Sequence, residues 1–174
     1  LAGMAAMIAS IDGDSPHALA EVLGFTLDCL EGQFAVYHRF DLEQGHIVTQ
    51  QGCKLPEDFR ECSRLSGQIC YEELVAAGRP RVVYPDLSRT VYMTSDPDVA
   101  RYHLRAYAGA SVRLHGQTIG SLAVYDHRPR EFDEIQCAVL DMASQWVACI
   151  TARLSSERQL VRKSAIDNVL SAVS

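Results

Sequence analysis

The chain has 174 residues, 48% of them hydrophobic, and its formal net charge at neutral pH is -6 with a sequence pI of about 5.5. This amount of apolar sequence can form one substantial core, and no long Pro-, Gly- or Ser-rich stretch divides the chain into two domains. The acidic balance and the scattered Lys and Arg residues argue against a positive surface for nucleic acid or for an anionic membrane.

The chain opens with an apolar run, residues 1–10, that is too short to span a bilayer and lacks the basic flank of a signal peptide. We therefore expect a cytoplasmic protein with no membrane partner and no nucleic-acid partner. Residues 1–14 are interpreted as an N-terminal helical extension or linker.

The first predicted helix runs from Pro16 to Leu30, where apolar residues recur every three or four positions. Asp14 or Ser15 is expected to cap this helix, with the proline in its first turn. Gly32 is expected to end it, because glycine accepts the backbone conformation that terminates helices.

Two β-rich runs follow, residues 34–41 and 46–52, with Gly45 in the turn between them. Their composition predicts a first hairpin. Residues 67–78 then predict a helix that ends at a glycine, and residues 80–87 predict a short strand.

Asp96 and Pro97 predict the start of another short helix, with the aspartate as its cap and the proline at its first position. Strands and helices thus mix without a regular alternation of strand, helix and strand. This order favours a largely antiparallel sheet in an α+β domain.

A second hairpin is predicted in residues 105–132, where two apolar runs flank Gly116 and Gln117. A two-residue turn with glycine first is typical of type II′. This register pairs, on one face, Leu114 with Ile119, Val112 with Ser121, Ala110 with Ala123 and Ala108 with Tyr125. On the other face it pairs Arg113 with Gly120, Ser111 with Leu122, Gly109 with Val124 and Tyr107 with Asp126.

Neither face of this hairpin carries charge in its middle, which is typical of a sheet covered on both sides. We expect the terminal helices on one side and the loops and short helices of residues 53–105 on the other. The alanine-rich face favours close packing of a helix, whereas the face of Tyr107 and Gly109 predicts a ligand cavity.

The last helix begins after Asp133, which forms a capping-box pattern with Gln136, and two adjacent apolar stripes continue to Leu154. At about 1.5 Å per residue, a helix over residues 134–174 would be about 60 Å long, which is more than one domain needs. Beyond a polar stretch, apolar residues resume in a different register: Leu160, Val161, Ile166, Val169, Leu170 and Val173. We expect them to contact the same helix of a second copy in a homodimer through the terminal helices; the alternative is an end that becomes ordered only in a longer protein.

Several short motifs follow one another over Gly67 to Ala148 with a spacing that resembles a GAF domain, the small-ligand sensory module of bacterial signalling proteins. The motifs are a G-x-x-C ending at Cys70, the Pro-Asp pair at Asp86, a Tyr-x-Gly from Tyr107 to Gly109, a Gly-x-x-x-Gly from Gly116 to Gly120, and Asp133 before the last helix. The resemblance implies an α+β, GAF-like (PAS-like) fold. Its central antiparallel sheet would have about five to six strands, with the N- and C-terminal helices on one face and loops and short helices forming a pocket on the other.

The resemblance also places the ligand pocket between the sheet and the segment from Cys70 to Tyr107. Tyrosine suits such a pocket because its ring is apolar while its hydroxyl can orient a ligand. Any one of these tyrosines can instead be a packing residue, and Asp86 can simply bind nearby backbone amides in its turn. The candidate ligand-binding residues are Phe40, Cys70, Tyr84, Asp86, Tyr92, Tyr102, Tyr107 and Tyr125.

The sequence predicts no catalytic, metal or cofactor site. The six histidines share no metal-ligand spacing with one another or with a cysteine, and the six cysteines show no C-x-x-C pattern, so reduced thiols are expected. Compared with the cyclic-nucleotide-binding members of the family, Asp126 and His127 replace the Asn-Lys pair, and Gln136 and Cys137 replace the Asp-Glu pair. The chain also has no Cys-His pair of the kind that attaches a bilin in light-sensing members.

Two alternatives remain open beside a sensor. A GAF-fold thiol enzyme of the free-methionine sulfoxide reductase type would use Cys70, but it needs a second cysteine before the hairpin, and none occurs between Tyr71 and Gln136. Cys70 can equally be a small buried residue. The other alternative is a dimerisation module with a vestigial pocket.

The sequence thus favours a non-catalytic sensory GAF domain at residues 15–154, with residues 155–174 as a signalling helix or linker. Its partners would be an unknown small-molecule ligand and an output domain in the same chain, such as a histidine kinase of a two-component system, a diguanylate cyclase or a transcription-activating module. A ligand would act through its different affinities for two conformations.

Overall fold

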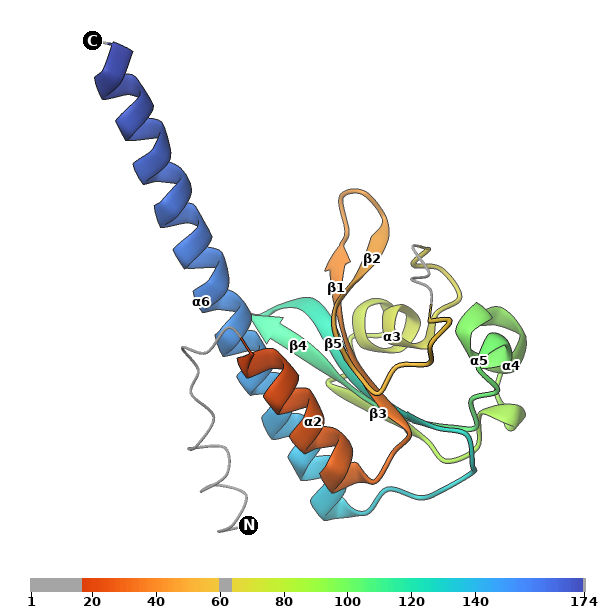
Figure 1. Ribbon diagram of the computed structural model, residues 1–174. Coiled ribbons are helices and arrows are strands. Elements are labelled where there is room, and N and C mark those ends of the chain that lie inside the picture. The colour runs from red at the N-terminus through yellow and green to blue at the C-terminus, as the bar shows by residue number, and fades with distance from the viewer. Residues whose placement is uncertain (1–16, 60–63, 174) are drawn as a thin grey trace.

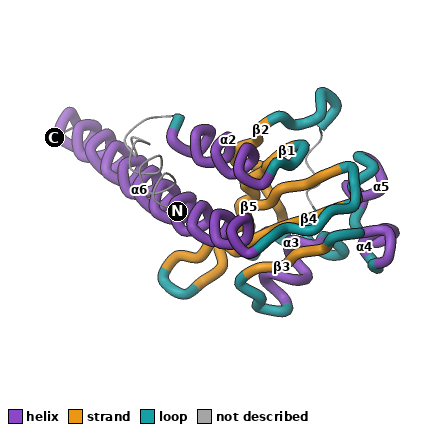
Figure 2. Tube along the Cα trace, turned by 90° about the horizontal axis from the view of Figure 1, so that it is seen from below, coloured by secondary structure: helices purple, strands orange, loops and turns teal. Residues whose placement is uncertain are grey.

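The computed structural model describes residues 17–59 and 64–173, and five antiparallel strands form one sheet in the order β2-β1-β5-β4-β3. Helices α2 and α6 run side by side across one face, which we call the outer face, and the short helices lie across the other, the inner face (Figures 1 and 2). The strands are β1 (Phe34–Asp41), β2 (His46–Cys53), β3 (Arg81–Tyr84), β4 (Ala106–Leu114) and β5 (Gln117–Asp126). The helices are α2 (Ala18–Leu30), α3 (Ile69–Tyr71), the π-helix η1 (Glu72–Ala76), the 3-10 helix η2 (Leu87–Arg89), α4 (Tyr92–Ser95), α5 (Pro97–Arg101) and α6 (Glu134–Val173). The predicted α+β fold, with terminal helices on one face and short helices on the other, is therefore confirmed.

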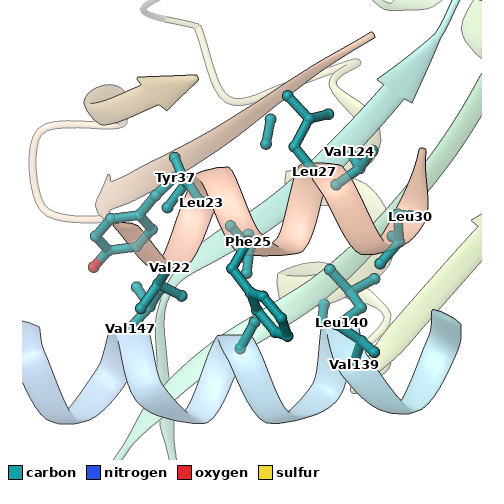
Figure 3. Packing of buried hydrophobic residues seen from close by; sticks show 14 of the residues in the cluster. Val22, Leu23, Phe25, Leu27, Leu30, Tyr37, Val124, Val139, Leu140 and Val147 are labelled. Atoms are coloured by element: carbon teal, nitrogen blue, oxygen red, sulfur yellow. The ribbon is translucent and has the colours of Figure 1, made fainter. Parts of the chain in front are cut away.

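The outer face is a closely packed apolar layer between the sheet and the two long helices (Figure 3). The alanines at positions 106, 108 and 110 of β4 let α6 approach the sheet, as the sequence predicts for this face. Leu23 and Leu27 of α2 are fully buried in the same layer. Each such side chain contributes about 1.5–3 kcal/mol through burial.

Helix α6 is divided by its surroundings rather than by its backbone. Its first half is packed on the sheet and α2 as far as Ile150, whereas residues 155–171 are exposed. The predicted capping box is confirmed, since Asp133 accepts from the backbone N–H of Gln136 at 2.8 Å and donates its own N–H to the Gln136 side chain at 3.2 Å. By length and composition alone α6 could cross a bilayer, but 39% of its apolar window is buried within the fold, so this is weak evidence for a membrane segment.

The register of the hairpin between β4 and β5 differs from the predicted one. Leu114 pairs with Gln117, and the turn residues are His115 and Gly116, both with positive φ (50° and 82°). Two positive φ angles are typical of a type I′ turn, which matches the twist of the strands. The predicted register is wrong because His115, not Gly116, takes the first turn position.

The register shifts between Val112 and Arg113, and from Tyr107 to Val112 each residue of β4 lies opposite a partner one position earlier in β5 than the prediction gives. Ala108 therefore pairs with Val124, and Ala110 pairs with Leu122, on the outer face. Tyr107 pairs with Tyr125 on the inner face. A one-residue slip moves side chains of one strand to the other face, so this correction decides which residues meet.

The two ends of α2 differ in part from the prediction. Its first helical residue is Ala18, preceded by His17, and the expected caps Asp14 and Ser15 lie outside the described residues. Its C-terminal cap is Glu31, which adopts the left-handed conformation at φ 52°, so Gly32 is not the terminator. Gly32 is needed for space instead, because a Cβ atom there would collide with Val124.

The predicted helix of residues 67–78 is a single α-helical turn that continues as the π-helix η1 and ends before Gly78, whose φ is 67°. The wider π-turn arises where the Ala77 N–H bonds the carbonyl of Glu72, five residues earlier. Such turns often occur at functional sites. In this chain the π-helix places the side chain of Glu73 in the interior.

Candidate functional site

The inner face of the sheet carries an aromatic row across four strands. Tyr84, Tyr107 and Tyr125 lie at paired positions of β3, β4 and β5, and Phe34 of β1 pairs with the last of them. The rings of Phe34 and Tyr125 stack with centroids 5.0 Å apart, and Tyr107 meets Tyr125 edge-on at 5.1 Å. Contacts of this kind add to the stability that burial alone gives.

A row of small residues lies beside the aromatic row and explains the low side-chain volume of this hairpin. Gly109 pairs with Ala123, and the Tyr107 ring lies over Gly109, so that a Cβ atom on the glycine would collide with the tyrosine hydroxyl. The glycine therefore lets a fully buried tyrosine lie along the sheet. The small residues hold an aromatic side chain of the protein itself.

A polar row lies beyond the small one. Ser111, Ser121, His38 and Thr49 occupy paired positions across β4, β5, β1 and β2. The Thr49 hydroxyl lies 3.3 Å from Nδ1 of His38, and burial lowers the pKa of this histidine to about 4. His38 is therefore neutral at physiological pH.

The inner face is covered by α3, η1 and the segment from η2 to α5, which we call the covering segment (residues 87–101). Asp96 holds two elements together, because its carboxylate accepts from the N–H of Ile69 in α3 and from the N–H of Asp98 in α5, each at 3.0 Å. The Ser95 hydroxyl donates to the carbonyl of Gly67 at 3.1 Å. These bonds fix the covering segment to the start of α3.

Glu73 is the acidic centre of a second set of contacts. Its Oε1 atom accepts from the hydroxyls of Tyr84 at 2.5 Å and Tyr92 at 2.6 Å, and Arg79 forms an ion pair with Oε2 at 3.0 Å. Burial alone would raise the pKa of Glu73, but the two tyrosine hydrogen bonds and the arginine outweigh it, so the pKa is lowered. Burial and the same bond to Glu73 raise the pKa of Tyr84 to about 12.

Cys70 belongs to the buried cluster of the inner layer and is only 2% exposed. Its thiol donates a weak hydrogen bond to Oε1 of Gln68 at 3.8 Å. Burial, followed by the negative charge of Asp96, strongly raises the pKa of the thiol. The five described cysteines are free thiols, and the sixth, Cys62, lies outside the described residues.

The structure brings most of the predicted ligand-binding residues together. Six of them belong to one buried cluster on the inner face, with Tyr84 partly buried at its edge. These six are Phe40, Cys70, Tyr92, Tyr102, Tyr107 and Tyr125. That a ligand binds among them stays a prediction.

Asp86 does not join this cluster. Its Oδ1 atom accepts from the N–H of Ser88 at 3.1 Å and from Arg105 at 3.2 Å, so it closes a turn at the surface. The hydrogen bonds from Ser88, and then Arg105, keep the pKa of Asp86 below its usual value. The local role that the sequence offers as an alternative for this residue fits the structure.

Several polar residues of the inner layer were missed at the sequence level: Ser121, His38, Glu73, Gln68, Asp96 and Asp98. The hairpin register would have revealed Ser121, because a turn at His115 and Gly116 pairs it with Ser111. In the sequence, Glu73 lies at a position where an α-helix would carry an exposed polar residue. The π-turn accounts for its burial in the structure. Asp96 was predicted as a helix cap and additionally binds α3.

Three buried polar atoms of the inner layer have no hydrogen-bond partner within the described residues. They are the Tyr107 hydroxyl, the Ser121 hydroxyl and Oδ1 of Asp98. Buried polar groups are nearly always paired, so each of these atoms calls for an explanation. No group of three His, Cys, Asp or Glu residues in the described ranges could hold a metal ion.

An open cavity outside the inner face is lined by charged side chains that already have partners. This cavity of about 440 Å³ lies between the sheet edge and α6, lined by Arg81, Ser111, Arg113 and Asp141 among others. The two arginines in it are already engaged, Arg81 with Asp141 and Arg113 with the carbonyl of Gly116 at 3.1 Å. The unpaired polar atoms therefore single out the inner face as the candidate site.

Comparison with solved structures shows what the fold is similar to. The GAF domain of a phosphoenolpyruvate-protein phosphotransferase from Acinetobacter superposes with a TM-score of 0.72 at 12% identity, covering 88% of this chain and 92% of that one. A domain of a putative two-component sensor histidine kinase from Sinorhizobium meliloti 1021 gives 0.67 at 15% identity, with 84% and 97% covered. Free methionine-R-sulfoxide reductase from Neisseria meningitidis, in complex with its substrate, gives 0.65 at 17% identity, with 90% and 87% covered.

Comparison with curated protein sequences finds no match. The family model of the GAF domain matches residues 17–150, which include the whole sheet and the packed half of α6. The resemblance of the sequence motifs and the predicted fold are both confirmed by this match and by the superpositions. The chain belongs to the GAF domain family.

Proposed function

We propose that this GAF domain is a non-catalytic sensory module of a bacterial signal-transduction protein. It binds a small molecule at the inner face and passes the effect through α6 to an output domain in the same chain, such as a histidine kinase. The observation that carries the proposal is the continuity of α6, whose first half is part of the core and whose second half leaves it without a break. A shift of the sheet would move the exposed half as a rigid lever.

The sensor role is supported by the sensor-kinase domain among the structures with this fold. The inner face supports ligand binding because short helices and turns, rather than long helices, cover it. Such segments open at a lower free-energy cost than core helices. We place the domain at residues 15–154 and the signalling helix at 155–174, in a cytoplasmic protein that binds neither nucleic acid nor a membrane.

The exposed half of α6 supports a homodimer. Its large apolar side chains are 50–70% exposed, and Ile166, Val169 and Leu170 lie at helical spacing on one stripe. A parallel pair of these helices would cover the stripe and place two output domains side by side. The N-terminal run expected to join them lies outside the described residues.

The dimer is tested by measuring the mass in solution of the 174-residue chain and of a chain ending at Leu154. We expect a dimer that is lost on truncation. Val169→Glu should also give a monomer, whereas Ser164→Glu, at another exposed position of the same helix, should leave the dimer intact. If the 174-residue chain is a monomer, the dimer is contradicted.

Ligand binding is tested by a thermal-shift screen of small metabolites, followed by amide NMR shifts to locate each hit. We expect at least one compound that raises the melting temperature and shifts amides of the inner face. A broad screen without any such compound favours the vestigial-pocket alternative. The dense aromatic packing of Phe34, Tyr107 and Tyr125 is the observation in favour of that alternative.

The thiol-enzyme alternative is disfavoured by the state of Cys70. A nucleophilic cysteine is a partly exposed thiolate, but this thiol is buried and its pKa is raised. The likeness to the reductase at 17% identity concerns the fold alone. Consumption of free methionine sulfoxide by the purified chain with a thiol reductant would restore the enzyme reading.

A further inference from the structure

The inner face contains two side chains whose hydroxyls are fully buried and unpaired. Tyr107 and Ser121 are each 0% exposed, and neither hydroxyl has a hydrogen-bond partner within residues 17–59 and 64–173. Tyr107 comes from β4 and Ser121 from β5, so the two hydroxyls belong to adjacent central strands. Leaving such groups unpaired costs free energy in the folded state.

The Cys70 thiol belongs to the same buried cluster of the inner face as Tyr107. A contact with the Ser121 hydroxyl lowers the pKa of the Cys70 thiol, but this contact falls outside the distance and angle of an ordinary hydrogen bond, so the hydroxyl keeps its capacity for a stronger partner. Tyr107 responds to the charge of the same cysteine. The Tyr107 hydroxyl lies over Gly109, which pairs with Ala123, and Ser121 lies two positions from Ala123 on the same face of β5. The two hydroxyls therefore lie around one point of the inner face.

A third unpaired atom comes from the covering segment. Oδ1 of Asp98 is buried and has no hydrogen-bond partner among the described residues. Asp98 belongs to α5, whose next residue, Val99, is buried in the inner-face cluster, so it lies on the same side of the sheet as the two hydroxyls. The inner face thus presents two hydroxyls, which can donate or accept hydrogen bonds, and one carboxylate oxygen, which accepts them.

The charges around this point are acidic. Beyond burial and the Cys70 thiol, Asp96 and Glu73 are the carboxylates that raise the pKa of Tyr107. Arg79 is paired with Glu73, and Arg101 at the exposed end of α5 only partly offsets Asp98. An anion would be repelled here, whereas an N–H donor would be attracted.

We infer that the ligand of the inner face is a small nitrogen compound, neutral or cationic, whose N–H groups donate to Tyr107, Ser121 and Asp98. Carboxylates and phosphates are excluded as the primary ligand class. This inference rests on the proposed function, since it assigns a ligand chemistry to the same face.

Three probes with the same skeleton of four heavy atoms test the class: acetamidinium, acetamide and acetate. Each is titrated into the ¹⁵N-labelled 174-residue chain at constant ionic strength, and amide shifts report affinity and location. We expect acetamidinium and acetamide to shift the amides of Tyr107, Gly109 and Ser121. Acetate should bind at least tenfold more weakly than acetamidinium.

Two variants connect the binding to the unpaired hydroxyls. Tyr107→Phe and Ser121→Ala should each weaken acetamidinium binding at least tenfold. Both should fold with an unchanged or higher melting temperature, because removing an unpaired buried hydroxyl removes a desolvation cost. A purely structural role of these hydroxyls would instead lower the melting temperature.

Matched controls come from the outer face. Tyr37 is also fully buried, and its hydroxyl accepts from Thr151 at 3.1 Å, while the Ser144 hydroxyl donates to the carbonyl of Asp141 at 2.8 Å. Tyr37→Phe and Ser144→Ala should therefore leave probe binding unchanged. These two variants remove the same hydroxyl groups as the inner-face variants, but from the outer face, where no ligand site is proposed.

The outcomes separate this inference from the proposed function. The ligand class is overturned if acetate binds as tightly as acetamidinium. It is also overturned if Tyr107→Phe and Ser121→Ala leave the binding of acetamidinium and acetamide unchanged. In both cases a sensor role still stands. The class is likewise overturned if none of the probes binds while a metabolite in the broad screen shifts inner-face amides. If neither probe nor metabolite shifts them, the ligand-binding function itself fails.

Discussion

The outer face of the sheet is covered by two long helices, whereas the inner face is covered by short helices and turns between residues 67 and 104. Both faces are buried, but the outer layer is almost entirely aliphatic, and the inner layer mixes aromatic rings with acidic, hydroxyl and imidazole groups. An aliphatic layer gains stability from close packing. The inner layer gives up part of that gain because it retains buried polar groups among its aromatic rings.

The same difference extends to how each layer is fastened. The outer layer is held by side-chain packing along the whole of α2 and the first half of α6. The shorter covering segment of the inner layer is fastened by the buried side chains of Leu87 and Val99 and by a few hydrogen bonds, chiefly those of Asp96 and of Tyr92 with Glu73. A few specific bonds can be broken together, so we expect the inner layer to open before the outer one.

The largest effect should come from emptying the outer layer. Leu23→Ala removes a fully buried side chain between α2 and the sheet, and such a change costs about 2–5 kcal/mol. Leu87→Ala removes an equally buried side chain from the inner layer, where the short covering segment can relax into the space. We expect Leu23→Ala to lower the free energy of unfolding in urea by clearly more than Leu87→Ala. Equal losses would contradict the difference in rigidity.

The next effect is a pH dependence that belongs to the inner layer. The pKa of His38 is lowered by burial to about 4, against 6.5 for a free histidine, so between these values the unfolded chain binds more protons than the folded one. The contribution of His38 to the free energy of unfolding is therefore complete above pH 6.5, and it falls by about 3 kcal/mol as the pH drops towards 4. Urea unfolding at pH 7 and pH 4.5 should show this loss, and His38→Gln should reduce it.

Asp98 changes the stability of the fold in the opposite direction to His38 over a similar pH range. Burial and the nearby Asp96 raise its pKa to about 6, so the folded chain takes up this proton first and stability rises as the pH falls from 6 towards 3.8. The exposed part of Asp98 weakens this contribution. Asp98→Asn should accordingly make the loss between pH 7 and pH 4.5 steeper than in the unchanged chain. If the stability of the unchanged chain and of the Asp98→Asn variant depended on pH with the same slope, the raised pKa of Asp98 would be contradicted.

The outer layer could be predicted from the sequence because its signals are periodic. Apolar spacing identified α2 and the packed half of α6, and the Asp133 and Gln136 pair located the start of α6. β-branched and aromatic runs identified both hairpins and β3. These signals are local, and the helical period directly tells which side is buried.

The inner layer was predicted only in outline because its contacts depend on register and on unusual backbone. The aromatic residues were found, but their row across the sheet appears only when His115 occupies the turn. The inward position of Glu73 requires a π-turn, which no sequence pattern announced. Residues that act through long-range pairing, such as Ser121 and His38, carry no local signal.

The smallest of the expected effects concerns the fit of one ring over one glycine. Gly109→Ala should cost about 1–3 kcal/mol, because the new methyl group meets the Tyr107 ring in a fully packed layer. In a Tyr107→Leu background the obstacle is absent, and alanine in a strand is preferred to glycine by about 0.5–1 kcal/mol, so the same substitution should become neutral or stabilising. Gly120→Ala is the matched control, since its methyl group would meet the backbone carbonyl of His38 and should destabilise the chain in both backgrounds. A double-mutant cycle in urea measures the coupling, and a cost of Gly109→Ala that persists without the ring would mean that the glycine serves the backbone rather than Tyr107.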